Sequence, residues 1–508
     1  CKIILILGTY ITFPELLLWF PLVTGLIAFF IKEQKSVKAW ALFSSLITLG
    51  ISVVSLCYSD STKYFTYNYV SYEWLKYIGS NFSVGLDGMG HMLTFLTALS
   101  YPIIFAATYK TEYKNANAFF GLMLLSQSGL MGVFVAMDAL VFYFFWELAL
   151  IPVYFLCSRW GGEKRIQATW KFFIYTFVSS LLMLIGIIYV YLQTQPTPTS
   201  DHSFSLVAFY NTHISPGDQS WLFWLFFIAF AVKMPVFPFH TWQPDTYEQS
   251  PAPVTMVLSG IMVKMGVFAV IRWVLPIFPS AVLKFDNIVI GLSIAGMLYA
   301  SCIAMVQNDL KRLVAYSSIA HIGLMCAAIF TTNTTGMSGV MIQMLNHGIN
   351  IIALWIVVDI IEKHTGIRKI SELGGLATHT PLLAIFFVVI ALANIALPLT
   401  NAFIGEFAMF TGLYEYNAWY AALAGLSIIL VAVYTLNMVQ KVFYGEDNIL
   451  TKVVSLVTVK QKIVLTFIVI FIFVLGVYPK PVFDLTATTV TTILSHLHDP
   501  SSVGLSEP

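Results

Sequence analysis

The chain has 508 residues, of which 58% are hydrophobic and 10% are charged, and its formal net charge is +1. Soluble domains carry roughly 25% charged and 45–50% apolar residues, so this composition excludes a water-soluble globular protein. A charge this close to zero excludes the basic surface that binding to nucleic acid requires, and the lipid bilayer is the expected environment.

Fourteen apolar runs are long enough to cross a bilayer, which takes about 20 helical residues each. The sequence therefore predicts an all-α polytopic membrane protein. Because Pro14, Glu15 and Pro21 interrupt the first run, its helix is expected to begin as late as Glu15. Residues 480–497 are expected to form a short amphipathic tail on the membrane surface. The predicted spans cover residues 4–31, 39–57, 85–108, 117–136, 138–157, 170–192, 220–247, 252–274, 286–305, 312–331, 336–361, 381–413, 417–443 and 461–479.

The basic residues divide unequally between the two sides of these spans. With the N-terminus outside, the cytoplasmic connections carry 18 lysines and arginines and the outer connections carry 6, with Arg272 counted among the outer ones. An excess of this kind is typical of cytoplasmic loops. The sequence therefore predicts that both termini lie outside.

Glu147 lies in the middle of the fifth span, in FYFFWELALIPVYFL, too deep to reach the lipid headgroups. Lys233 ends the apolar part of the seventh span, and a charge inside a membrane costs roughly 2.5–3.5 kcal/mol unless it is used or paired. We expect Glu147 and Lys233 to form a pair whose tightening and loosening makes a switchable proton site. A static buried ion pair is the alternative.

Lys233 opens the string KMPVFPFHTWQPD, in which Pro235 and Pro238 lack the N–H that a helix needs. The seventh span is therefore expected to break here, and irregular backbone at membrane depth is tolerated where it lines a wet cavity or is buried in protein. His240 and Asp245, from the same string, are candidates for proton entry or gating.

Lys264 in LSGIMVKMG is a second intramembrane lysine, at a depth from which its side chain cannot reach the interface. His321 in AYSSIAHIG and His347 in MLNHGIN follow on later spans. A single buried histidine is a hydrogen-bonded core residue as often as it is a proton carrier. Two of them among hydroxyl and amide groups favour a proton relay. Glu406 ends this row, and Pro398, eight residues before it, is expected to break the twelfth span.

Interrupted helices at matching places indicate internal repeats. Spans four to eight and nine to thirteen each carry a break in their fourth span, so two five-helix units are expected, the second inverted. The predicted divisions are residues 1–110 (three helices), 111–275 (first repeat), 276–445 (second repeat) and 446–508 (last helix and tail). The five cysteines form no CxxC pair, so no metal site or bound cofactor is expected in this chain.

KMPVFPFHTWQPD, LSGIMVKMG, NDLKRLVAYSSIAHIG and the central Trp-Glu of span five together resemble the antiporter-like subunits of respiratory complex I and of multi-subunit cation/proton antiporters. The resemblance covers about residues 80–445. Among these subunits the L- and N-types are expected to carry lysine in span twelve and the M-type glutamate, so Glu406 in FIGEF favours the M-type. Two departures are Tyr247, where the family has a histidine, and LPLTNAF, where it has a glycine-rich break.

The resemblance implies that Glu147 and Lys233 form the modulating pair, that Lys264 is the central relay, and that His321 and His347 link the halves. Glu406 would open toward the outside or pass protons onward. The expected partners are L-, N- and K-type membrane subunits in a bacterial inner membrane, with flavin, iron–sulfur clusters and quinone in other chains. A sodium/proton antiporter subunit and a membrane scaffold are the alternatives.

Overall fold

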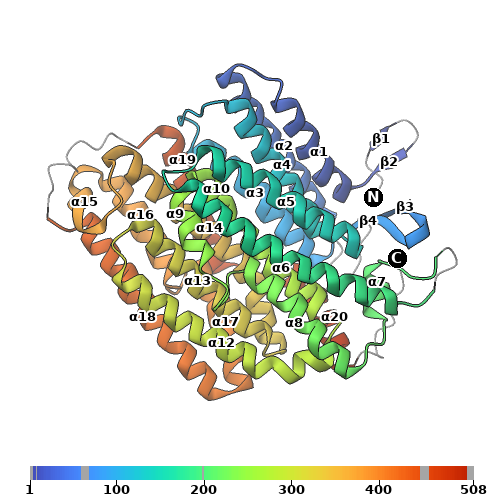
Figure 1. Cartoon of the computed structure of the whole chain (residues 1–508). Helices are drawn as coiled ribbons and strands as arrows, with labels where there is room; N and C mark the ends of the chain where they lie inside the picture. The colour runs from blue at the N-terminus through green and yellow to red at the C-terminus, as the bar shows by residue number, and fades with distance from the viewer. Residues whose placement is uncertain (1–3, 7–8, 59–67, 197–199, 447–456, 500–508) are drawn as a thin grey trace.

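The computed structural model describes residues 4–6, 9–58, 68–196, 200–446 and 457–499. In this part of the chain helices dominate, and the strands form two antiparallel hairpins, β1 (Ile4–Ile6) with β2 (Thr9–Ile11) and β3 (Tyr69–Leu75) with β4 (Ser80–Gly85). Figure 1 shows both hairpins and α7 (Leu206–Tyr210) at one end of the helical bundle and α15 (Leu376–His379) at the opposite end.

The first helix, α1, runs from Phe13 to Ala28, so the predicted span at 4–31 begins too early. Residues 4–11 form the β1–β2 hairpin instead. The start of α1 is fixed locally, because the backbone N–H of Thr12 donates to Glu15 Oε2 at 2.8 Å and Pro14 occupies the first turn, where its missing N–H costs nothing.

Of the helices in the described residues, 11 are long and apolar enough to cross a membrane, and α1 and α16 are shorter apolar helices. The predicted total of 14 spans therefore stays a prediction. The long helices are α2 (Gln34–Cys57), α3 (Gly88–Ala107), α4 (Ala116–Val135), α5 (Ala139–Trp160), α6 (Arg165–Gln193), the segment Ala252–Val274, α12 (Pro279–Val306), α13 (Leu310–Ile329), α14 (Thr334–Thr365), α18 (Ala418–Phe443) and α19 (Val459–Val477).

Two of the predicted spans are pairs of helices separated by irregular backbone. In the first, α8 (Pro216–Lys233) ends at Lys233 and α9 (Trp242–Gln249) begins beyond Pro235 and Pro238. In the second, α16 (Pro381–Asn394) and α17 (Asn401–Tyr416) are separated by six residues that include Pro398. Ala396 and Leu399 in this second break have φ of 56° and 77°, a region that residues with a side chain seldom adopt.

The segment Ala252–Val274 is continuous but irregular. Two α-helical pieces, α10 (Ala252–Val257) and α11 (Val263–Ala269), alternate with two π-helical turns, η2 (Leu258–Met262) and η3 (Val270–Val274). A π-turn widens the helix and shifts its hydrogen bonds by one residue, which is a feature often found at functional sites. Lys264 is the second residue after η2, so the geometry of this turn influences where its side chain points.

The last described helix, α20 (Lys480–His498), is amphipathic, but its buried side covers protein and not lipid. It packs along α3 and α14, and Thr486, Thr489 and His496 are each 1% exposed. The expected tail on the membrane surface is therefore a component of the bundle.

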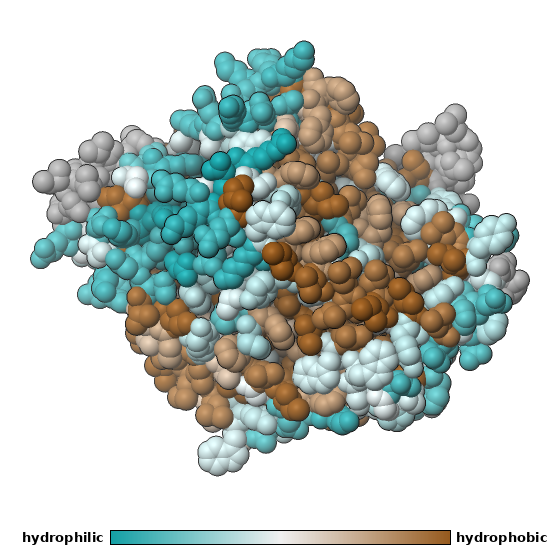
Figure 2. All heavy atoms as spheres, viewed as in Figure 1, coloured by the Kyte–Doolittle hydropathy of each residue, from teal (hydrophilic) through white to brown (hydrophobic). Residues whose placement is uncertain are grey.

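Figure 2 shows hydrophilic side chains gathered over α9, α10 and α15 and a broad apolar band over α6 and α8. Large apolar side chains are also exposed on single helices, such as Ile185 on α6 and Ile429 on α18. A surface of this kind is what contact with lipid tails requires.

Candidate functional site

Lys264 lies near the middle of the segment Ala252–Val274 and has no solvent exposure. Its Nζ donates to the carbonyl oxygen of Ser259 at 2.8 Å, a carbonyl that belongs to the π-turn η2. The same Nζ lies 2.7 Å from His347 Nδ1 on α14. The structure therefore joins Lys264 and His347, which are 83 residues apart in the sequence, through a short contact between two groups that can each carry a proton.

His321 and Glu406 form a second contact of the same kind. His321 Nδ1 on α13 lies 3.0 Å from Glu406 Oε1 on α17, and both side chains are at most 10% exposed. Gln343 on α14 donates to the same carboxylate oxygen at 3.3 Å. Glu406 therefore has one partner that can give or take a proton and one that can only hold it in place.

The rings of His321 and His347 join these two contacts, with centroids 5.6 Å apart. Four of the predicted residues thus follow one another through the core, and we call Lys264, His347, His321 and Glu406 the buried row. His321 Nε2 and His347 Nε2 have no hydrogen-bond partner among the described residues. Unpartnered ring nitrogens at this depth are the positions where bound water is expected.

Glu147 and Lys233 are close enough to interact electrostatically, but no ion pair joins them in the described part of the chain. Lys233 Nζ instead lies over the rings of Trp146 and Phe172, at 5.5 and 6.0 Å from their centroids. The carboxylate of Glu147 lies near the hydroxyl group of Ser180 on α6. The expected ion pair is therefore not formed here, and aromatic rings lie around the ammonium group. We call this unpaired arrangement open; that Glu147 and Lys233 tighten into a pair stays a prediction.

His240 and Asp245, the two candidates for proton entry, lie in different surroundings. His240 is 2% exposed, and its ring packs against Phe237 and Tyr299. Asp245 is half-buried and accepts from Lys171 at 2.7 Å and from Arg312 at 3.0 Å. Neither residue contacts the buried row, so its part in proton entry stays a prediction.

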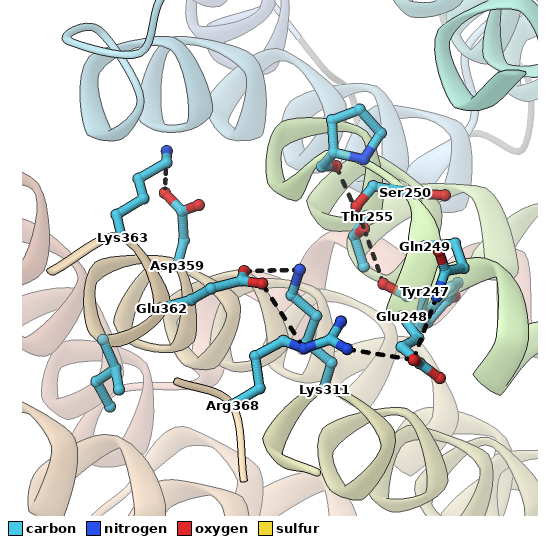
Figure 3. A network of polar contacts seen from close by, with 12 residues as sticks. Tyr247, Glu248, Gln249, Ser250, Thr255, Lys311, Asp359, Glu362, Lys363 and Arg368 are labelled. Atoms are coloured by element: carbon cyan, nitrogen blue, oxygen red, sulfur yellow. Dashed lines mark hydrogen bonds and ion pairs between the residues drawn. The ribbon is translucent and has the colours of Figure 1, made fainter. Parts of the chain in front are cut away.

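Asp245 belongs to a larger set of ion pairs at one end of the bundle, the face predicted to be cytoplasmic. Figure 3 shows part of this set, in which Arg368 reaches Glu248 at 3.4 Å and Lys311 pairs with Glu362 at 2.7 Å. We call it the basic-face network; its members are Lys171, Asp245, Glu248, Asp309, Lys311, Arg312, Glu362 and Arg368. It joins α9, beyond the first break, to α13 and α14.

The sequence did not predict the contacts that two groups of site residues make. Asn346 and Asn350 of α14 hold the start of α17, since Asn346 donates to the Asn401 carbonyl at 2.7 Å and Asn350 donates to the Asn401 side chain at 3.0 Å. Arg272, expected in an outer connection, is fully buried and pairs with Asp87 of α3 at 2.6 Å. Arg272 lies two residues from the end of its helix, so its position in the sequence resembles that of a loop residue.

Comparisons with known proteins are consistent across the chain. A family model described as NADH:quinone oxidoreductase/Mrp antiporter, transmembrane, matches residues 136–432. The NADH-quinone oxidoreductase subunit M of Rickettsia typhi is 37% identical over 440 residues, which cover 84% of this chain and 87% of that protein.

Two solved structures share the fold. A chain of respiratory complex I from Thermus thermophilus superposes with a TM-score of 0.86 at 27% identity, covering 94% of this chain and 99% of that chain. A chain of the Mrp complex from Dietzia sp. has a TM-score of 0.81 at 19% identity and covers 97% of this chain and 98% of that chain, a likeness of fold alone.

Proposed function

The chain belongs to the NADH:quinone oxidoreductase/Mrp antiporter family as an M-type subunit, and we propose that it moves protons across the membrane as part of a respiratory NADH:quinone oxidoreductase. The observation that carries this proposal is the buried row. Its two short contacts, at 2.7 and 3.0 Å, bring together four titratable side chains of buried residues. Each would be costly to bury unless it were used.

The row transfers a proton in three steps. Lys264 and His347 share a proton across their 2.7 Å contact, because the free electron pair of either nitrogen can accept it. The two histidine rings lie 5.6 Å apart, so the second step needs a bridging water or a rotation of one ring. His321 then exchanges the proton with Glu406 directly across 3.0 Å.

Glu147 and Lys233 would control this transfer electrostatically. In the open arrangement, Lys233 is held by aromatic rings and its positive charge is only partly balanced by Glu147. Movement of Glu147 toward Lys233 would neutralise that charge and so lower the electrostatic barrier to a proton on Lys264. In a medium of low dielectric constant, a change of a few ångströms between two charges shifts their interaction by several kcal/mol.

The energy would come from other subunits. We propose that flavin, iron–sulfur clusters and quinone lie in partner chains, that the neighbours in the membrane are L-, N- and K-type subunits, and that the protein acts as a translocase without a redox centre of its own. The membrane would be a bacterial inner membrane with both termini outside, as the distribution of basic residues indicates.

A subunit of a sodium/proton antiporter without a redox partner is the second candidate. The fold shared with the Mrp chain is compatible with it. Glu406 disfavours it, because the resemblance leads us to expect lysine at this place in antiporter subunits. The identity to subunit M over most of both chains also supports the first candidate.

The test uses membrane vesicles that contain the whole complex. We expect Glu406→Gln to lower NADH-driven acidification strongly, since an amide cannot bind and release a proton in the working pH range. Glu406→Asp keeps a titrating group one methylene shorter and should retain much of the activity. The acidification rates of both variants are normalised to the amount of assembled complex on a native gel. Full acidification with the glutamine variant would refute the proposed terminal role of Glu406.

A further inference from the structure

A cavity of about 650 Å³ lies at the face predicted to be cytoplasmic. Its lining comes from the end of α12, the start of η4 (Ile370–Glu372) and the end of α18, three segments next to connections that carry the cytoplasmic excess of basic residues. Asn308, Lys441 and Glu446 line its exposed part, and Tyr434, which is 1% exposed, lies in its buried wall. A cavity with this lining is wide enough and polar enough to hold several waters.

Tyr434 is joined to the interior by a hydroxyl contact. Its O–H donates to Ser317 Oγ at 2.9 Å, and Asn394 Nδ2 donates to the same oxygen at 3.3 Å. A serine hydroxyl group has two lone pairs and one hydrogen. Because both lone pairs of Ser317 receive a donor, its own O–H remains to donate further inward.

The His321–Glu406 contact lies one helical turn further along α13. Ser317 precedes His321 by four residues on α13, so the two side chains lie on the same helical face about 5–6 Å apart at Cβ. A small cavity of about 10 Å³ is lined by His321, Glu406 and Val431, and its size is close to that of a single water. Val431 lies one helical turn from Tyr434 on α18, so each cavity takes one lining residue from the same stretch of this helix.

We propose that Tyr434 and Ser317 form a hydroxyl gate through which protons pass between the cytoplasmic cavity and the His321–Glu406 pair. The inference rests on the proposed function and adds an access route to it. Protons would therefore reach the acid end of the row from the cytoplasmic side, and not only through Lys264.

The transfer leaves every hydroxyl group neutral. A hydronium ion in the cavity gives a proton to Tyr434 Oη while Tyr434 passes its own proton to Ser317 Oγ. Ser317 passes its proton through one water in the small cavity to His321 or Glu406. Each hydroxyl group gains one proton and loses one, and both must rotate before the next transfer.

The second broken helix is in contact with this gate. Asn394, which donates to Ser317, is the last residue of α16, and the irregular backbone with positive φ at Ala396 and Leu399 begins directly after it. Movement of the break would therefore shift the amide that holds Ser317. The gate would open or close with the same conformational change that moves Glu406 on α17.

The first arm of the test removes the hydroxyl groups. In vesicles with assembled complex, we expect Tyr434→Phe and Ser317→Ala to lower the rate of NADH-driven acidification by about tenfold or more, because a positioned proton-transfer group contributes roughly 10²–10⁴-fold. Ser317→Thr keeps the hydroxyl group and should restore most of the rate. If the alanine and threonine variants pump equally, packing and not the hydroxyl group is what matters, and the gate is refuted.

The second arm closes the cavity without touching the gate. Asn437 lines the cavity, whereas its neighbour Leu436 is 48% exposed on the lipid-facing side of α18. Asn437→Cys and Leu436→Cys are treated with a bulky, membrane-impermeant thiol reagent in inverted vesicles, which present the cytoplasmic face, and each is compared with its own untreated sample. We expect only Asn437→Cys to be modified and to lose pumping, and the same treatment of right-side-out vesicles to leave it unmodified.

The outcomes separate this inference from the proposed function. If Glu406→Gln abolishes pumping but fully modified Asn437→Cys pumps normally, the row stands and the cytoplasmic inlet is wrong. If modification occurs only in right-side-out vesicles, the cavity faces the other side and the inlet is likewise wrong. If Glu406→Gln itself pumps normally, the terminal role of Glu406 and the inlet that leads to it both fail.

Discussion

Two acceptors contact the ammonium group of Lys264, and only one of them can accept a hydrogen bond in every protonation state. The Ser259 carbonyl is part of the backbone and is held by the π-turn, whereas His347 Nδ1 accepts only while that nitrogen carries no proton. Protonation of His347 would therefore place two cations side by side without solvent. The protonation state of the His347 ring thus decides whether a positive charge on Lys264 is stable. The position of the proton and the arrangement of the two side chains are therefore linked at this contact.

A substitution of Glu147 tests the role of a single side chain in proton pumping. We expect Glu147→Gln to reduce proton pumping strongly, because Lys233 then lacks the negative charge that Glu147 places near it. Removing one member of a tight buried ion pair costs about 3–5 kcal/mol, but the open arrangement of Glu147 and Lys233 should cost less, so the complex should still assemble. Acidification by vesicles is measured after assembly is checked on a native gel. Glu147→Asp is the matched control, and normal pumping by the assembled glutamine variant would contradict the assignment.

The residues of the buried row could be recognised in the sequence because titratable side chains stand out in an apolar span. Their partners could not be recognised. Gln343 is a neutral amide in a helix that is buried all round, and Arg272 finds Asp87 at a separation of 185 residues. Sequence spacing within one helix carries no information about contacts of such long range. Glu147 and Lys233 are near each other but unpaired. This arrangement depends on the positions of the two side chains, which the composition of the sequence does not determine.

At the scale of elements, prolines predict where a helix is interrupted, since they remove a hydrogen bond and clash with the preceding turn. The breaks between α8 and α9 and between α16 and α17 contain such prolines. Amphipathicity is less informative, because it shows that one side of a helix is covered but not by what. For this reason α20 was expected on lipid, whereas its apolar side packs on α3 and α14. The inverted relation between residues 111–275 and 276–445 stays a prediction.

Asp87 allows the role of α20 to be tested. It pairs with buried Arg272, caps α3 through the Gly90 N–H at 2.8 Å, and accepts from Thr489 of α20 at 3.1 Å. We expect Asp87→Asn to lower stability by about 3–5 kcal/mol, because Arg272 would be left buried without its counter-charge. Thr489→Val removes a single hydrogen bond and should cost about 1 kcal/mol. Thermal unfolding of the purified complex compares the two, and equal shifts would mean that the ion pair does not stabilise this region.

At the scale of the whole molecule, the basic-face network connects the two broken-helix units. Lys171 on α6 reaches Asp245 on α9, and Arg312 on α13 contacts both Asp245 and Glu248. A single exposed ion pair contributes little, but a network of several charges holds its elements in a defined arrangement. A shift of α9 would therefore displace α13, the helix that carries Ser317 and His321. This connection is a physical route by which the first unit could act on the second.

The chain as a whole needs an external source of energy, and this gives the last prediction. A row of shared protons at equilibrium moves none in a preferred direction, so something outside the row must drive it. The relatives named as subunits of NADH-quinone oxidoreductase favour a redox source, whereas the Mrp fold alone would favour an ion gradient. An affinity-tagged chain solubilised in mild detergent is therefore expected to co-purify with proteins that carry flavin and iron–sulfur clusters, and the preparation should oxidise NADH with quinone as acceptor. The measurement is mass spectrometry of the native complex together with its visible absorbance. Recovery of small membrane proteins alone, from a preparation in which the tagged chain remains assembled, would favour the antiporter and contradict the assignment to an NADH:quinone oxidoreductase.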